Sequence, residues 1–347
     1  IMDGFFFAYL CLMLNSNKYS FIIPVFNRPE EVKELLESFV KLDFTAAYEI
    51  VIIEDGSINT SKDIISVFKE NLNISYYFKE NSGPGDSRNF GMQKAKGNYF
   101  IILDSDCILP PHYLKTVDAF LKKKFYDCFG GADSANTDFT LVQKAINYAM
   151  TSFYTTGGIR GSEKSIKKFE PRSFNMGISK KVFLKTKGFS KIHPGEDPDL
   201  SQRILKENYQ TVFIPNAFVY HKRRLSWEKF YQQVYKFGLV RPILNDWHPN
   251  AASITFWFPT FFVFFVIASL FFGILFNFLF LVPIIAYLSM VLLDASTKNK
   301  SISIGLLSII AVFIQFIGYG SAFLKSTIYI RFLKRDPKKQ FPKLFFK

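Results

Sequence analysis

The stretch Phe100-Ile-Ile-Leu-Asp-Ser-Asp-Cys107 decides how the rest of the chain is arranged. Its apolar run is typical of a strand buried on both faces of a parallel sheet, and Asp104 and Asp106 follow where the strand ends. Residues two positions apart in an extended chain point the same way, so both carboxylates can face one site. Such hard oxygen donors suit Mg²⁺ or Mn²⁺, with diphosphate oxygens and water as further ligands. Asp is also common in loops and at helix N-caps, so the pair alone does not define a metal site.

Strand and helix patterns alternate on the N-terminal side of this stretch. We expect strands over 19–25, 49–53, 74–78 and from residue 100, and helices over about 29–42, over about 61–71 and after the Gly-rich residues 81–91. This order with short connections predicts a parallel, doubly wound sheet with right-handed crossovers. Asp55, the loop 81–91 and the Asp104/Asp106 pair should therefore meet at one edge. No G-x-G-x-x-G follows the first strand, which excludes the dinucleotide-binding version.

The charge of the chain is strongly basic, with 43 Lys and Arg against 29 Asp and Glu and a net charge of +14. Nucleic acid is one partner for such a charge, and an anionic membrane surface with anionic substrates is the other. The basic residues gather at 222–241 and 325–347, on both flanks of an apolar region, which favours membrane lipids and argues against nucleic acid. Three cysteines without metal-ligand spacing, Cys11, Cys107 and Cys128, indicate no disulfide framework.

The apolar region begins near residue 253. Residues 254–293 carry no charge and are long enough for two membrane spans with a break at about 273–277, and 302–324 is a third candidate. Residues 227–240 alternate apolar side chains with Lys and Gln at helical spacing, which predicts an amphipathic interfacial helix. We expect a multi-pass protein of the inner cell membrane, with the preceding domain on the cytoplasmic face. Three spans would place the basic segment 325–347 on the opposite side, so either one apolar segment does not cross or the positive-inside tendency fails.

Six motifs occur in order between residues 19 and 240. They are Pro24-Val25-Phe26-Asn27; Glu54-Asp55-Gly56-Ser57; Asn81-x-Gly83 with Arg88-Asn89-x-Gly91; Asp104-Ser105-Asp106; Asn175-Met176-Gly177 with Gly188-Phe189; and Gly195-Glu196-Asp197-Pro198-Asp199-Leu200 with Arg203. Together they resemble the motifs of family 2 glycosyltransferases, although Glu54 replaces an Asp and Lys187 a Gly of the usual pattern. The resemblance implies an α/β GT-A fold, with a Rossmann-like, mostly parallel sheet followed by transmembrane helices.

The resemblance also implies a nucleotide-diphosphate sugar as donor, with UDP as the expected nucleotide. The donor-binding residues that it implies are Pro24, Phe26, Asn27, Asp55, Gly83, Arg88, Asp104 and Asn175. Phe26 would lie against the uracil ring, Asp55 would accept its N3–H, and Arg88 would pair with phosphate or base oxygens. The structural alternatives are a turn-forming Asp before Gly for Asp55 and a surface helix residue for Arg88.

Metal binding and catalysis are assigned by the same resemblance. Asp104 and Asp106 would hold Mg²⁺ or Mn²⁺, and His221 either joins the metal or is a solvated loop residue. Asp197 would act as the general base in an inverting displacement, and Glu196 either replaces it or orients the acceptor. The alternative for both is an acidic helix N-terminus.

These expectations define a membrane-anchored, metal-dependent, inverting glycosyltransferase that moves a sugar to a hydroxyl of a lipid-linked or polysaccharide acceptor. A transferase that uses polyprenyl phosphate as acceptor is the alternative enzyme, and a non-catalytic membrane scaffold with the same fold is the alternative class. The expected divisions are an N-terminal extension at 1–18, the catalytic domain at 19–226, the interfacial helix and linker at 227–252, the transmembrane region at 253–324 and the basic juxtamembrane segment at 325–347.

Overall fold

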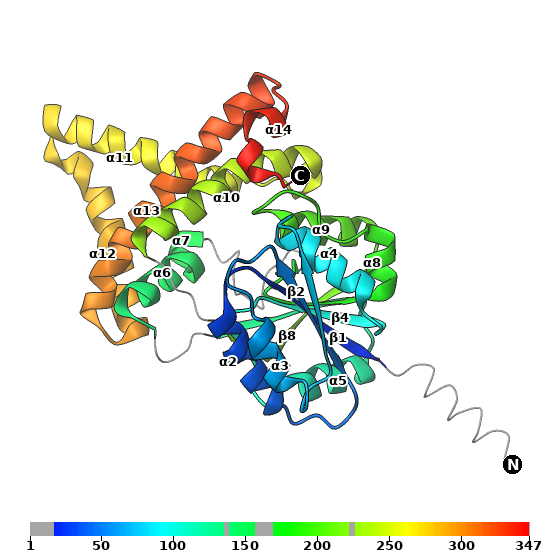
Figure 1. The fold of residues 1–347 in the computed structure, drawn as a ribbon. Coiled ribbons are helices and arrows are strands. Elements are labelled where there is room, and N and C mark those ends of the chain that lie inside the picture. Colours follow the sequence, from blue (N-terminus) through cyan, green and yellow to red (C-terminus); the bar gives the residue numbers. More distant parts are fainter. Residues whose placement is uncertain (1–16, 135–138, 157–168, 222–225, 347) are drawn as a thin grey trace, which may run out of the picture. The chain divides into compact units, whose positions relative to one another are not determined.

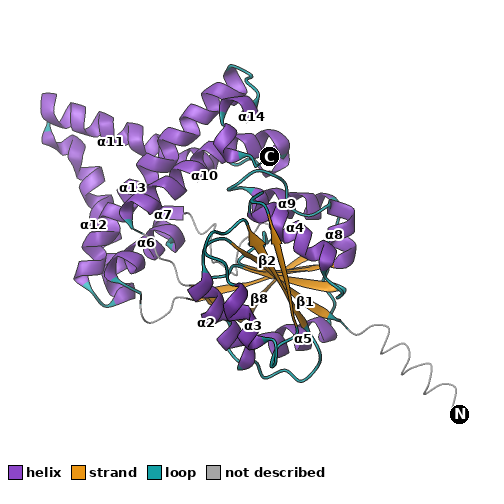
Figure 2. Ribbon diagram, in the orientation of Figure 1, coloured by secondary structure: helices purple, strands orange, loops and turns teal. Residues whose placement is uncertain are grey.

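The computed structural model describes residues 17–134, 139–156, 169–221 and 226–346, so the expected extension at 1–18 lies almost wholly outside the described residues. The chain divides into two compact units. The first contains strands flanked by helices, whereas the second consists mainly of helices (Figures 1 and 2). The first unit comprises Ile1–Ser134, Phe169–Ser190 and Arg203–His221, and the second comprises Ala135–Lys168, Lys191–Gln202 and Lys222–Lys347.

An open eight-stranded sheet in the order β3-β2-β1-β4-β7-β6-β8-β5 forms the centre of the first unit. The neighbouring strands β3, β2, β1 and β4 are parallel, as the sequence predicts. The strand bounds are β1 Tyr19–Val25, β2 Glu49–Asp55, β3 Ile74–Lys79, β4 Tyr99–Leu103, β5 Cys107–Ile108, β6 Cys128–Ser134, β7 Asn175–Ser179 and β8 Thr211–His221.

The second half of the sheet is mixed. Strand β7 runs antiparallel to both β4 and β6, and β5 runs antiparallel to β8, whereas β6 and β8 are parallel. The expected parallel arrangement is therefore confirmed for β1 to β4, and the sheet as a whole is mixed. The physical reason is the connection: several elements separate β4 from β7 in the sequence, so no single right-handed β-α-β crossover sets the direction of β7.

Helices cover both faces of this sheet. Leu35 of α2 and Val117 of α5 belong to the same apolar cluster as Phe21 of β1, on one face. On the other face, Gly91 of α4 lies so close to Ile22 and Ile53 that a Cβ atom would meet their side chains at 2.7 and 2.5 Å. The helix bounds are α2 Pro29–Val40, α3 Lys62–Phe68, α4 Pro84–Lys94, α5 Tyr113–Lys123, α8 Lys180–Thr186 and α9 Glu196–Lys206, of which α9 begins in the second unit.

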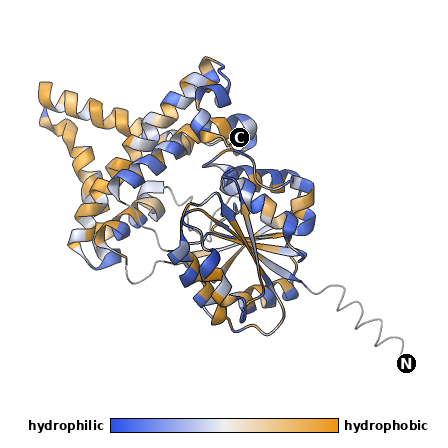
Figure 3. Ribbon diagram, viewed as in Figure 1, coloured by the Kyte–Doolittle hydropathy of each residue, from blue (hydrophilic) through white to orange (hydrophobic). Residues whose placement is uncertain are grey.

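Three long helices in the second unit are apolar enough to cross a membrane. The candidate spans are Ile254–Leu275, Phe278–Asn299 and Ile302–Phe332, with mean hydropathies of 2.4, 2.2 and 2.2. Figure 3 shows their hydrophobic colouring over α11, α12 and α13. The first two are separated at Phe276 and Asn277, as the sequence predicts, and the Asn277 side chain caps the next turn by accepting from Leu279 N at 2.9 Å. The part of the chain that the structure describes therefore contains three membrane-spanning candidates.

The elements of this unit are centred on α13, against which α6, α10, α11 and α12 pack. They are α6 Leu141–Thr151, α7 Phe153–Thr156, α10 Trp227–Trp247, η1 Pro249–Ala251, η2 Ile254–Trp257, α11 Phe258–Leu275, η3 Phe278–Leu281, α12 Val282–Asn299, α13 Ile302–Thr327, η4 Ile328–Phe332, α14 Pro337–Gln340 and η5 Pro342–Leu344.

Helix α10 differs from the expected interfacial helix. It is 21 residues long, and Phe230 and Val234 are buried in a cluster with Phe316 of α13. The two helices approach closely because Gly238 lies against the backbone of Tyr319. Part of the apolar face of α10 is thus used for protein packing. An amphipathic pattern does not distinguish lipid from protein as the apolar partner.

Candidate functional site

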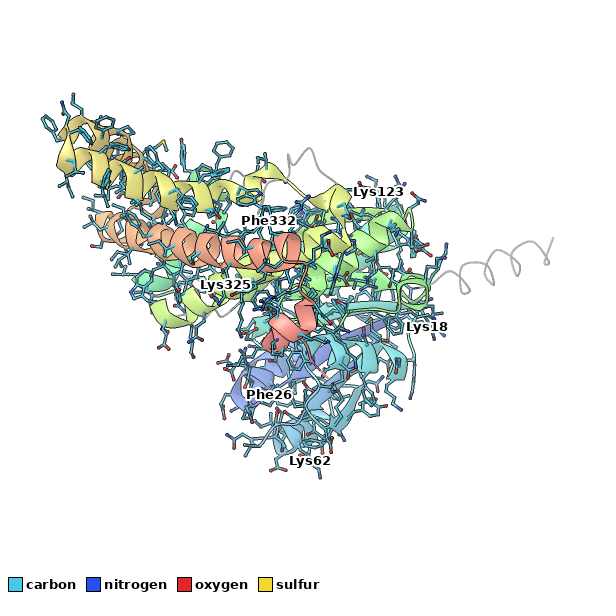
Figure 4. All side chains as sticks on the ribbon, turned by 90° about the horizontal axis from the view of Figure 1, so that it is seen from above. Lys18, Phe26, Lys62, Lys123, Lys325 and Phe332 are labelled. Atoms are coloured by element: carbon cyan, nitrogen blue, oxygen red, sulfur yellow. The ribbon has the colours of Figure 1, made fainter. Side chains whose placement is uncertain are left out.

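The turn after β1 is tied to the turn after β2 through Asn27. Its backbone N donates to Ser57 Oγ at 2.7 Å, and its Oδ1 accepts from Ile58 N at 2.8 Å and Asn59 N at 3.1 Å. Asn27 has a φ of 53°, a left-handed conformation that Asn tolerates better than most residues. The preceding Phe26 is 51% exposed (Figure 4), so its ring is available for stacking. Asn27 therefore positions the loop on which Phe26 stands.

Asp55 ends β2 and is only 3% exposed. Its Oδ1 accepts from Ser82 N at 3.0 Å and Lys79 Nζ at 2.6 Å, and its Oδ2 accepts from Gly83 N at 2.9 Å. Gly83 has a φ of 92°, which glycine adopts without steric cost. A carboxylate offers about four acceptor positions, so these three donors leave room for one more. Asp55 thus organises the Gly-rich loop and can still accept one hydrogen bond.

Lys79, at the end of β3, is a member of this site that the sequence analysis missed. Its Nζ lies 2.6 Å from Asp55 Oδ1 and 3.3 Å from Asp86 Oδ2, and it also donates to the Ser82 hydroxyl. The Lys79 side chain is 14% exposed. The available signal was its place at the end of a parallel strand, two residues before the Asn81 motif.

Glu54, which departs from the family pattern, is completely buried. Its Oε2 accepts from Ser61 N at 2.8 Å and from the Tyr76 hydroxyl at 3.4 Å. Burial, with the charge of Glu54, raises the pKa of Tyr76 to about 12. The longer side chain of Glu thus reaches the segment that opens α3, which gives it a structural role.

Two guanidinium groups lie against the acidic pair after β4. Arg88 Nη2 donates to Asp104 Oδ1 at 2.9 Å, and the Arg88 guanidinium carbon is 5.2 Å from the centre of the Phe189 ring. Arg28 Nη1 lies 2.5 Å from Asp106 Oδ2. Partial burial lowers the pKa of Arg28, but the charge of Asp106 and the hydrogen bond to it raise that pKa to a net value above the ordinary one. Arg28 was also missed, because its partner lies 78 residues away in the sequence.

The acidic pair fits a divalent cation by the chemistry of its donors. The side chains of Asp104 and Asp106 are 32% and 14% exposed, so both can reach a ligand. Over the described ranges, no three His, Cys, Asp or Glu side chains are grouped closely enough to hold a metal. Mg²⁺ commonly takes one or two carboxylates and completes its shell with substrate phosphates and water, which two Asp residues satisfy. His221 ends β8, where its backbone pairs with Cys107, next to Asp106, and its side chain lies outside the described part.

Asn175 is placed in the core of the sheet. It is fully buried, and its Oδ1 accepts from the Tyr113 hydroxyl at 2.6 Å while its Nδ2 donates to Ala217 O at 2.8 Å and Ala132 O at 3.2 Å. These bonds hold β7 to its neighbours beside Leu103, with which Asn175 pairs. Its side chain therefore acts within the protein. Pro24 lies in β1 opposite Ile53, where it shapes the end of the strand.

Glu196 and Asp197 open α9 and belong to the second unit. Glu196 Oε1 lies 2.9 Å from His193 Nδ1, and in the same turn Asp199 Oδ1 lies 2.8 Å from His248 Nε2. Glu196 and Asp199 are buried, whereas Asp197 is partly exposed. The structure thus places Phe26, Asp55 and Asp104 at the carboxyl edge of the parallel strands and Asn175 in the core of the sheet. Glu196 and Asp197 belong to the second unit, together with two histidines that the sequence left without a role.

A parallel half-sheet with Asp55 at the end of β2, Asp104 and Asp106 after β4, and Arg88 on the intervening helix α4 is the architecture of the GT-A fold. The family model described as glycosyl transferase family 2 matches residues 20–186, and the chain therefore contains a domain of that family.

Individual relatives cover smaller or larger parts of the chain. An uncharacterized glycosyltransferase of Rickettsia felis is 40% identical over 94 residues, which is 27% of this chain and 15% of the relative. The GalNAc(5)-diNAcBac-PP-undecaprenol β-1,3-glucosyltransferase of Campylobacter jejuni is 27% identical over 207 residues, 58% of this chain and 63% of the relative. The matched regions thus span less than two thirds of these relatives.

One solved structure shares the fold over most of the chain. It is the mannosyltransferase PcManGT from Pyrobaculum calidifontis in complex with GDP-Man and Mn²⁺, which aligns with a TM-score of 0.56 at 14% identity. The alignment covers 92% of this chain and 88% of that chain. At this identity the likeness concerns the fold alone.

Proposed function

We propose that the protein is an inverting glycosyltransferase that moves a sugar from a nucleotide-diphosphate donor, UDP-sugar in the first instance, to a hydroxyl group of a membrane-held glycan. The observation that carries this proposal is the set of ion pairs at the carboxyl edge of the sheet: Arg88 with Asp104, Arg28 with Asp106, and Lys79 with Asp55. Alternating acidic and cationic side chains at one edge suit a diphosphate and its counter-ion.

The donor nucleotide is bound by the loops after β1, β2 and β3. Phe26 stacks on the base from its exposed position, and Asp55 uses its remaining acceptor position for the N3–H of uracil. Gly83 allows the backbone of its loop to approach the nucleotide closely. Pro24, Asn27 and Asn175 support these groups from within the protein.

The diphosphate is held by charged groups that follow β1, lie on α4 and follow β4. Arg28 and Arg88 pair with its oxygens, because guanidinium groups bind phosphate through two parallel hydrogen bonds. Asp104 and Asp106, with His221 as a further candidate, would hold Mg²⁺ or Mn²⁺. Such a cation stabilises negative charge on the leaving diphosphate when it is bound. Arg28 and Arg88 neutralise the carboxylates until the ligand arrives.

Asp197 removes the proton of the acceptor hydroxyl as its oxygen attacks the anomeric carbon. The bond from that carbon to the donor phosphate breaks on the opposite face, so the anomeric configuration inverts. Glu196 orients the acceptor or the loop, since its carboxylate is buried and paired with His193.

The acceptor is proposed to be lipid-linked. Three helices of the second unit are long and apolar enough to span a membrane, and the Campylobacter relative is described as acting on an undecaprenol-linked glycan. We place the catalytic domain on the cytoplasmic face of the inner membrane, where nucleotide sugars are found.

A screen of the purified full-length protein tests this proposal. The protein is incubated with a panel of UDP, GDP and other nucleotide sugars, with and without Mn²⁺ or Mg²⁺, and followed by donor hydrolysis and thermal stabilisation. One class of nucleotide sugar should stabilise the protein in a metal-dependent manner. A protein that neither binds nor hydrolyses any member of the panel would be a scaffold. Membranes supplied with labelled donor and bare polyprenyl phosphate provide the second arm: a labelled lipid phosphate product would identify polyprenyl phosphate as the acceptor instead.

A further inference from the structure

The segment Phe341–Phe346, here called the strap, pairs with the residues that precede the candidate bases. His193 N donates to Leu344 O at 2.8 Å, and Phe346 N donates to Lys191 O at 3.0 Å. Ile192 and Phe345 form an antiparallel bridge between these two hydrogen bonds. The strap therefore adds a short strand to residues 191–193, although more than 140 residues separate the two segments.

Buried apolar side chains of the strap also anchor it. Phe341 and Leu344 are 8% and 3% exposed. They share one buried cluster with Ile192 and with Val240 and Leu244 of α10. The strap lies within the basic juxtamembrane segment expected at 325–347, and these two of its apolar side chains are buried. Because the cluster includes Ile192, burial of the strap directly fixes the chain before α9.

The turn between residue 193 and α9 is also held by contacts with α10 and the residue that caps it. Gly195, with a φ of 123°, lies so close to α10 that a Cβ atom would stand 2.5 Å from Val240 Cγ1. Asp199 N donates to Gly195 O at 3.1 Å, and the Asp199 carboxylate contacts His248, the residue that caps α10. Asp197 lies between Gly195 and Asp199 in the sequence. Its position therefore depends on the contacts of these two residues with α10, and on the pairing of the strap with residues 191–193.

We propose that the strap is a positioning element for the catalytic base of the sugar-transfer reaction, acting through residues 191–195 on Asp197 and Glu196. The inference rests on the proposed function. The strap follows the third candidate span, which ends at Phe332, so it links the base to that membrane helix through only a few residues. General-base catalysis depends on placing the carboxylate within hydrogen-bonding distance of the acceptor hydroxyl.

The test compares two double variants of the full-length protein. Phe341→Ala/Leu344→Ala removes the buried anchors, and Phe332→Ala/Leu333→Ala makes the same substitutions at neighbouring side chains that are 73% and 53% exposed. Phe332 is labelled in Figure 4. For the strap variant we expect kcat to fall about tenfold or more, as a misplaced catalytic group predicts. The donor KM should stay within about twofold, since donor binding uses other residues. The exposed pair should behave like wild type, and Leu344→Met should restore activity.

Hydrogen exchange provides a readout that does not require activity. The amide of His193 should exchange faster in the strap variant, while amides of β1 to β4 keep their protection. Faster exchange at His193 with unchanged kcat would overturn the inference, as would a general loss of protection in which kcat and donor KM change together. A wild-type protein that transfers no sugar contradicts the proposed function instead, and the exchange experiment still reports on the strap.

Discussion

Arg28 Nη1 lies 2.5 Å from Asp106 Oδ2, so the turn after β1 supplies a cation to the acidic pair after β4. The Arg28 side chain is 46% exposed, and an ion pair of this kind contributes only about 0–1 kcal/mol to stability. Its contribution is therefore expected in ligand binding. Arg28→Gln should leave the melting temperature nearly unchanged. It should raise the donor KM about tenfold, the loss of affinity expected when one phosphate contact is removed. Lys115→Gln, which removes an exposed ion pair with Asp43, is the matched control. Equal donor KM values for the two variants would contradict the assignment.

Loss of either carboxylate of the acidic pair should strongly reduce metal-dependent transfer. Asp104→Asn and Asp106→Asn are each expected to lower kcat by about 10²–10³ while the protein remains folded, as for removal of one electrostatic stabiliser. Chelation with EDTA should stop transfer by the wild type, and added Mn²⁺ or Mg²⁺ should restore it. Asp43→Asn changes an exposed carboxylate of the same unit and should have no effect. Full activity in EDTA would show that these residues serve another purpose.

The contact between Lys79 and Asp55 should be important for both folding and donor binding. Their side chains are only 14% and 5% exposed, so Lys79→Met leaves a buried carboxylate without its cation. We expect a loss of about 3 kcal/mol in the free energy of unfolding, together with a raised donor KM because the loop at Ser82 and Gly83 loses its support. Lys62→Met, at the exposed start of α3 (Figure 4), should change neither quantity.

Asp197→Asn separates chemistry from binding. A general base contributes about 10²–10⁴ to the rate, so kcat should fall by that factor. Calorimetric binding of UDP should be unchanged, since the donor residues lie in other loops. Asp246→Asn alters an exposed acidic residue of α10 and provides the control. If Asp197→Asn turns over normally and Glu196→Gln does not, the roles of the two carboxylates are exchanged.

The pKa of Tyr76 predicts a dependence of stability on alkaline pH. Burial and the charge of Glu54 raise this pKa to about 12 in the folded state, against about 10 for an unfolded chain. A raised folded-state pKa stabilises the fold fully below the unfolded pKa, and the contribution is lost as pH rises from about 10 to about 12. The free energy of unfolding should therefore fall more steeply in wild type than in Tyr76→Phe across that window. Parallel pH curves would indicate that Tyr76 titrates normally.

The sequence was sufficient for the four parallel strands and their loops, because buried β-rich runs and the residues that end them are local signals. Lys79 and Arg28 were missed because their roles depend on partners that only the folded sheet brings near. Asn175 was predicted from a motif, yet its neighbours on β8 and α5 determine that its side chain is buried.

The helical region shows a different limit. The apolar pattern of α10 predicted the helix but not its partner, which is determined by the close approach of Gly238 to α13. The pairing of the strap with residues 191–193 left no local signal, since a backbone bridge carries no side-chain motif. Long-range contacts of this kind account for most of the structural features that could not be predicted from the sequence.

The length of the helix that starts at Ile302 has a consequence for the choice of lipid. Its 31 residues extend about 46 Å at 1.5 Å per residue, whereas the hydrocarbon core of a bilayer is about 30 Å thick. If Lys325 marks the boundary of the hydrocarbon, the seven residues that follow it rise about 10 Å beyond it, through the headgroup layer. In bilayers with longer acyl chains, more of this end of the helix would lie within the hydrocarbon core, or the tilt of the helix would change. Acyl-chain length should then tune the turnover of the enzyme even where headgroup composition is constant.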